Sequence, residues 1–192
     1  MLSSVSPKDI AITAGAAATL ALLIRWFVIG VFVIPSHSMD NTLMAGDHIV
    51  VSKLKMAIGS VNRGDVVVFN LPDSLRGTAP DEPFIKRVIA VEGDSVQLTR
   101  LGITVNGRLF PDPPLSAATS PVEDGHIEYR VPGGHVFVMG DNRSNSWDSR
   151  YWGFLPIEEI IGAPLFVYWS SGPTTTDTSD HVRWNRIFNG VQ

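Results

Sequence analysis

An apolar run from Ile10 to Ile34 constrains this chain more than any other feature, because its residues have to leave water together. Arg25 is the only charged residue in it. The run exceeds the roughly 20 residues with which a helix crosses a bilayer. A charge at mid-membrane is costly, so Arg25 is expected at the headgroup level, with Trp26 beside it. We therefore predict a transmembrane helix over residues 9–25.

Other interpretations of this run remain open. We expect residues 26–34 to form an apolar strand along the membrane surface, but a single helix continuing to Ile34 is the alternative. The run could also be a cleaved secretion signal, with Ser36 and Ser38 as the small residues before the cut. That reading is weakened because the run is long for a signal core and only Lys8 precedes it as a basic residue.

Composition excludes several classes of protein. The 192 residues have room for one compact domain plus an anchor. The net charge of −4 gives no basic face for nucleic acid. The absence of cysteine excludes disulfides, thiolate nucleophiles and thiolate metal sites.

After Met39, short β-branched runs alternate with turn residues. Asn106-Gly107 is a strong signal for a two-residue hairpin, because both central positions of a type I′ turn need positive φ. A proline at the start of residues 156–161 predicts one short helical turn there. Many short strands at this spacing indicate a mainly β domain of packed antiparallel sheets or a partial barrel. The predicted strands cover residues 48–52, 65–69, 85–91, 95–98, 102–105, 127–131, 135–139 and 163–169.

The candidate chemistry centres on a serine and a lysine. A serine hydroxyl needs a base to remove its proton, and no Gly-x-Ser-x-Gly motif supports a histidine triad. A lysine can replace histidine if burial lowers its pKa. Among Lys8, Lys53, Lys55 and Lys86, only Lys86 lies within an apolar stretch, Phe84 to Ile89. A lysine on the solvated face of an edge strand remains the alternative for Lys86.

Four motifs in order make the chain resemble bacterial type I signal peptidases, which are membrane-anchored serine–lysine endopeptidases. The resemblance covers the anchor and almost all of residues 26–170. The four motifs are Pro35-Ser36-His37-Ser38-Met39, Gly64-Asp65-Val66-Val67-Val68-Phe69, Phe84-Ile85-Lys86-Arg87-Val88 with Gly93-Asp94, and Gly140-Asp141-Asn142-Arg143 through Asp148-Ser149-Arg150. His37 and Asn41 stand where glycine and proline are frequent in the family.

The resemblance implies roles for individual residues. Ser38 is the expected nucleophile and Lys86 the expected general base. Ser36 supplies a hydroxyl to the oxyanion hole beside the backbone N–H of Ser38, and Ser146 orients the lysine. Asp148 and Arg150 form a structural ion pair. For Ser36 and Ser146, ordinary turn hydrogen bonding is the alternative.

The resemblance also implies an organisation and a partner. It divides the chain into a tail (1–8), an anchor (9–25), a peptidase domain (26–170) and a C-terminal tail (171–192). The domain is expected outside the plasma (inner) membrane, where it cuts exported precursor proteins after small-x-small sites without metal or cofactor. A serine–lysine protease with one dedicated substrate and a catalytically silent binding domain are the other functions that remain open.

Overall fold

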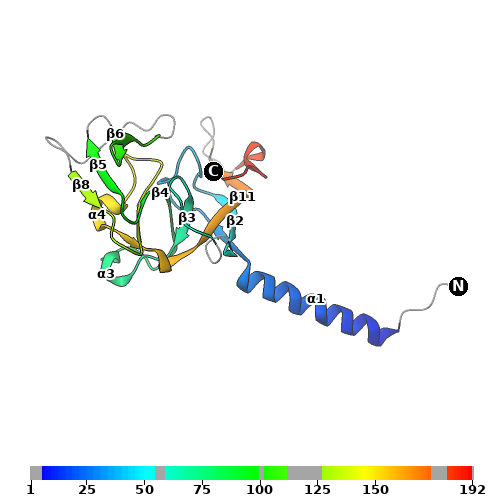
Figure 1. Cartoon of the computed structure of the whole chain (residues 1–192). Coiled ribbons are helices and arrows are strands. Elements are labelled where there is room, and N and C mark those ends of the chain that lie inside the picture. The colour runs from blue at the N-terminus through cyan, green and yellow to red at the C-terminus, as the bar shows by residue number, and fades with distance from the viewer. Residues whose placement is uncertain (1–5, 55–58, 100–101, 112–126, 174–180, 192) are drawn as a thin grey trace.

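The computed structural model describes residues 6–54, 59–99, 102–111, 127–173 and 181–191. A long helix, α1 (Pro7–Phe27), extends away from a domain built from the strands (Figure 1). The domain is mainly β, as the sequence predicts, and its strands form two antiparallel sheets. Lys55 and most of the C-terminal tail before residue 181 lie outside the described residues.

The helix α1 contains the predicted range 9–25 and ends two residues later, at Phe27. The strand β1 (Ile29–Val33) follows at once, so the helix does not continue to Ile34. The β-branched residues from Val28 onward favour the extended conformation at this point. Along α1, side chains such as Ile12, Leu20 and Leu22 are more than half exposed. Within the described part of the chain, no helix has the length and apolarity that identify a membrane span.

The larger sheet is built from β1 together with β2 (Asp47–Ser52), β3 (Val66–Phe69), β4 (Phe84–Val91), β9 (His135–Met139), β10 (Leu155–Pro156), β11 (Ile160–Gly172) and β12 (His181–Val182). The strand order is β1-β2-β11-β3-β4-β9-β10, and β12 also pairs with β11. The strand β11 therefore lies between two groups of strands. Register shifts where β11 pairs with β2 and β3 let this long strand bend and join both groups.

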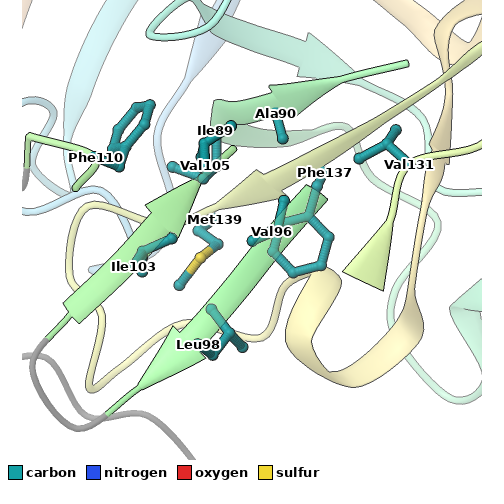
Figure 2. Packing of buried hydrophobic residues seen from close by; sticks show 10 residues of the cluster. All are labelled: Ile89, Ala90, Val96, Leu98, Ile103, Val105, Phe110, Val131, Phe137 and Met139. Carbon is teal, nitrogen blue, oxygen red and sulfur yellow. The ribbon is translucent and has the colours of Figure 1, made fainter. Parts of the chain in front are cut away.

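The smaller sheet packs its own core against the larger one. Its order is β7-β6-β5-β8, from β5 (Ser95–Thr99), β6 (Gly102–Val105), β7 (Arg108–Leu109) and β8 (Ile127–Arg130). Between β6 and β7, Asn106 and Gly107 have φ of 52° and 75°, which confirms the predicted hairpin turn. Apolar side chains of β5 and β6 meet those of β4 and β9, among them Ile89 and Phe137 (Figure 2).

Short helical turns connect the strands: α3 (Asp73–Arg76), α4 (Ser149–Trp152), η1 (Ile157–Glu159) and η2 (Trp184–Arg186). The turn η1 falls within residues 156–161, where a helical turn is predicted. A second core lies beneath the segment that follows β1, where Met39, Leu43 and Ile49 are fully buried. This core fixes the backbone on both sides of Ser38.

Candidate active site

Ser38 and Lys86 lie together although 48 positions separate them. The Nζ atom of Lys86 is 2.7 Å from Ser38 Oγ and 3.0 Å from the carbonyl oxygen of Ile85. Both side chains are buried, with Lys86 3% exposed. The amine is therefore within reach of the serine proton and has little contact with solvent.

The strand β4 explains how a lysine comes to be buried here. Alternation along the strand puts Lys86 on the same face as Phe84, whose ring centroid is 6.0 Å from Nζ. Burial lowers the pKa of Lys86 from 10.5 to about 8, although the carboxylates of Asp148 and Asp141 act in the opposite direction. About a tenth of the amine is thus neutral at pH 7 and able to accept a proton.

The two other predicted serines lie beside this pair in different ways. Ser36 Oγ is 3.3 Å from Ser38 Oγ, so its hydroxyl is next to the reacting oxygen. Ser146 Oγ is buried and has no hydrogen-bond partner among the described residues, so the structure does not show a bond from it to Lys86. Ser146 Oγ and the carbonyl oxygen of Ser38 both face Gly140, where a Cβ atom would overlap them.

Asp148 and Arg150 form a buried bidentate ion pair. Arg150 Nε and Nη2 lie 2.7 and 2.8 Å from the two carboxylate oxygens of Asp148. Asp148 also accepts the backbone N–H of Gly140 at 3.0 Å, and Arg150 donates to the carbonyl oxygen of Ser146 at 3.2 Å. The pair therefore fixes the loop that carries Ser146 against the end of β9.

A second network of hydrogen bonds surrounds Asp141, a residue of the fourth sequence motif. Asp141 is fully buried and accepts Arg87 Nε at 2.8 Å and Thr42 Oγ1 at 2.5 Å. The next residue, Asn142, donates its backbone N–H to the carbonyl oxygen of Ser38 at 3.1 Å. Strand alternation puts Arg87 on the opposite face of β4 from Lys86, but no local pattern in the sequence connects it with Asp141 or Thr42.

A small apolar cavity lies where β1 ends and β4 begins, and Ile85, the neighbour of Lys86 in the chain, is in its lining. Its volume is about 140 Å³, well below the roughly 300 Å³ and more of a typical ligand pocket. Phe32, Ile34, Val68 and Ile85 contribute to its walls, and Glu82 lies at the same cavity. A space of this size accepts a small side chain.

The side chain of His37 is exposed and is not part of the buried Ser38–Lys86 pair. Its side chain is 64% exposed, and Nδ1 lies 3.1 Å from a carboxylate oxygen of Asp40. In the described residues, no three histidine, aspartate or glutamate side chains gather as metal ligands would.

Comparisons with known proteins agree on one family. The profile described as signal peptidase, peptidase S26, matches residues 8–169. A probable signal peptidase I-2 of Synechocystis is 39% identical over 153 residues, covering 80% of this chain and 69% of that protein. A probable signal peptidase I-1 of the same organism is 44% identical over 155 residues, with coverages of 78% and 76%. Among solved structures, a signal peptidase I from Enterococcus faecalis matches with a TM-score of 0.42 and 23% identity, over 55% of this chain and 97% of that one.

Proposed function

From the premise that this chain belongs to the signal peptidase (peptidase S26) family, we propose that Ser38 is its nucleophile and Lys86 its general base. The chain is a serine endopeptidase that removes signal peptides from precursor proteins. The observation that supports the assignment of residues is the 2.7 Å separation between Lys86 Nζ and Ser38 Oγ inside a buried site.

The reaction begins when neutral Lys86 takes the proton of Ser38. The serine oxygen attacks the carbonyl carbon at the cleavage site, and the C–O bond that forms pushes the carbonyl electrons onto oxygen. The protonated lysine then gives its proton to the leaving amine as the peptide bond breaks. Water, deprotonated by the same lysine, releases the signal peptide from Ser38.

The remaining site residues act on these two. The hydroxyl of Ser36 and the backbone N–H of Ser38 stabilise the oxyanion, a contribution typically worth a few kcal/mol. Ser146 Oγ, which is buried and finds no hydrogen-bond partner in the part of the chain that the structure describes, is available to bind the lysine when its amine carries the extra proton. Asp148 and Arg150 keep this serine in place through the buried ion pair.

The substrate binds in an extended conformation beside the residues that end β1 and begin β4. Backbone hydrogen bonds of the strand-addition kind supply affinity there. The cavity of about 140 Å³ between Ile34 and Ile85 admits a small side chain and excludes a large one. This supports cleavage after small-x-small sites in exported precursors.

Membrane attachment by α1 is the second part of the proposal. The helix covers the predicted anchor, residues 9–25, and extends away from the domain (Figure 1). Apolar side chains along it, such as Ile12, Leu20 and Leu22, are more than half exposed. Such an apolar surface needs a non-aqueous partner. In this arrangement the helix makes a single pass through the plasma membrane, and the peptidase domain, residues 26–170, lies on its outer side with the C-terminal residues 171–192 following it.

The test is cleavage of a precursor with an Ala-x-Ala site by the full chain in detergent. We expect Ser38→Ala and Lys86→Ala to abolish cleavage because each removes one half of the reacting pair. Lys53→Ala is the matched control, since Lys53 is half-buried at the end of β2 and away from Ser38. Normal cleavage by Lys86→Ala would exclude the proposed base. Cleavage of only one dedicated substrate by the wild type would identify a serine–lysine protease with a single substrate. Failure of the wild type to react with a serine-reactive probe would identify a catalytically silent binding domain.

A further inference from the structure

The last described residues, 181–191, return along β11 and form what we call the C-terminal strap. The family profile ends at residue 169, so the strap lies beyond it. Backbone N–H groups of Arg183 and Phe188 donate to Ser170 and Val167 of β11 at 2.9 and 2.7 Å. These bonds attach the strap to the sheet as an added edge.

The strap contributes Arg186 to a fully buried carboxylate at the start of β2. Arg186 Nε lies 3.0 Å from Asp47 Oδ1, and Arg186 Nη2 lies 2.5 Å from Asp47 Oδ2. Asp47 also accepts Ser170 Oγ at 2.7 Å and the backbone N–H of Met44 at 2.8 Å. Burial alone would raise the pKa of Asp47, but these bonds, that of Arg186 first, hold it below its usual value.

Arg186 also reaches the segment that carries the serine. Its Nη2 atom donates to the carbonyl oxygen of Thr42 at 3.0 Å. The turn containing Thr42 begins at Met39, whose carbonyl oxygen accepts the N–H of Thr42 at 3.1 Å. One guanidinium thus binds both ends of residues 42–47, and the first of those ends is one turn from Ser38.

The same segment is held on its other side by the Asp141 network. Thr42 Oγ1 donates to Asp141, and Asn142 donates to the carbonyl oxygen of Ser38. The backbone is also closely packed at Gly46, because a Cβ atom there would overlap the carbonyl oxygen of Ser171 in β11. The segment from Ser38 to Asp47 is therefore clamped between the Asp141 loop and the strap.

We propose that Arg186 is a positioning residue that, through Thr42 and Asp47, keeps Ser38 at reacting distance from Lys86. The inference rests on the proposed function of the Ser38–Lys86 pair. The side-chain hydrogen bonds of Arg186 go to Asp47 and to the carbonyl oxygen of Thr42, so it acts on the pair through the backbone of residues 42–47. A displacement of about 1 Å at a reacting atom can lower a rate by up to roughly a hundredfold.

The main variant is Arg186→Lys, because it keeps a positive charge beside buried Asp47. A lysine cannot reproduce the forked contact with the carboxylate and the Thr42 carbonyl together. We expect kcat for precursor cleavage to fall by roughly tenfold or more while KM changes by less than about threefold. Arg186→Ala also removes the nearer of the two arginines at Asp47, leaving Arg183 Nη2 at 3.8 Å, and should lower kcat further.

The matched control is Arg63→Lys. Arg63 makes the same kind of forked contact with buried Asp94, at 2.6 and 2.5 Å, outside the serine segment. It should lower the unfolding temperature as Arg186→Lys does and leave kcat within about twofold of wild type. Equal losses of kcat in the two lysine variants, or a wild-type kcat in Arg186→Lys, would overturn the inference.

Hydrogen exchange separates this inference from the proposed function. In the full-length protein, the backbone amides of residues 38–44 should exchange at least several-fold faster in Arg186→Lys than in the wild type. In Arg63→Lys their exchange rates should equal those of the wild type. If the wild type failed to cleave any precursor, the proposed function would fall, but exchange would still decide whether Arg186 holds the segment. Unchanged exchange in Arg186→Lys overturns the inference whatever the activity.

Discussion

The amine of Lys86 shows how one residue can serve the proposed chemistry at a cost to the fold. Its side chain is buried, and the carboxylates of Asp148 and Asp141 act on its charge. Burial disfavours the ammonium form more than the carboxylates favour it, so the pKa falls to about 8. Two measurements follow from this balance.

The first measurement is the pH dependence of cleavage. Only the neutral amine accepts the proton of Ser38, and it is protonated below its pKa of about 8. We expect kcat/KM to fall roughly tenfold for each pH unit below about 7 and to level off above about 8.5. A profile that stayed flat between pH 5 and 9 would contradict lysine as the base.

The second measurement is the stability of Lys86→Met. In the unfolded chain the lysine binds its proton up to about pH 10.5, whereas in the folded chain it releases the proton above about 8. Below pH 8 the folded state therefore carries the full penalty of the buried charge, roughly 3 kcal/mol for a pKa lowered from 10.5 to about 8. A methionine of similar size removes that penalty, so the inactive variant should unfold at a higher temperature at pH 7.

The gain should shrink as the pH rises from 8 toward 10.5, because in that window the folded lysine is neutral while the unfolded lysine is still protonated, so the stability of the wild type rises with pH. Lys53→Met is the control at a half-buried lysine and should change stability by less than about 0.5 kcal/mol. A Lys86→Met variant less stable than wild type at pH 7 would show that the interactions of the amine outweigh its desolvation.

At the scale of elements, the site depends on how closely the end of β9 approaches the serine segment. Gly140 follows β9, and a Cβ atom there would overlap Ser146 Oγ and the carbonyl oxygen of Ser38. We expect Gly140→Ala to lower kcat/KM by tenfold or more, because a backbone cannot yield as the tip of a flexible side chain can. Thermal unfolding should also shift down by several degrees.

Gly133→Ala provides the comparison for Gly140→Ala, because a Cβ atom at Gly133 would meet nothing within 4 Å. It lies in the turn before β9, in the same region of the chain, and its activity should remain that of wild type. Wild-type activity in Gly140→Ala would mean that the backbone around Gly140 and Ser38 can move enough to accept a Cβ atom without disturbing the site.

The elements were predictable because their signals are local. Residues 85–91, for instance, were predicted as a strand from β-branched residues, and β4 spans Phe84–Val91. The length of β11 was underestimated at 163–169, because a strand of 13 residues with register shifts has no regular alternation to mark its ends. The pairing order, in which β11 joins β2 to β3, depends on long-range contacts that no local pattern carries.

At the scale of the whole molecule, the candidate pair could be identified from the sequence, but the residues that hold its backbone in place could not. Ser38 and Lys86 stood out as a hydroxyl after an apolar run and an amine within one. Thr42, Asp141 and Arg186 did not, since their importance comes from contacts across about 100 positions or more, such as that of Thr42 with Asp141. A polar residue in a loop gives no sign in the sequence that it will be buried beside another.

The arrangement of helix and domain leads to the last prediction, which concerns a variant lacking residues 2–25. The removed part of α1 extends away from the β domain, which retains both of its sheets and the Ser38–Lys86 pair (Figure 1). We expect the variant to cleave a short soluble Ala-x-Ala peptide in detergent with kcat/KM within about threefold of wild type, because the site is intact. On a precursor embedded in vesicles it should be slower by tenfold or more, since attachment to the same bilayer raises the effective concentration of enzyme and substrate. Equal activity on vesicles would contradict attachment by α1, whereas loss of the peptide reaction would show that the helix supports the domain itself.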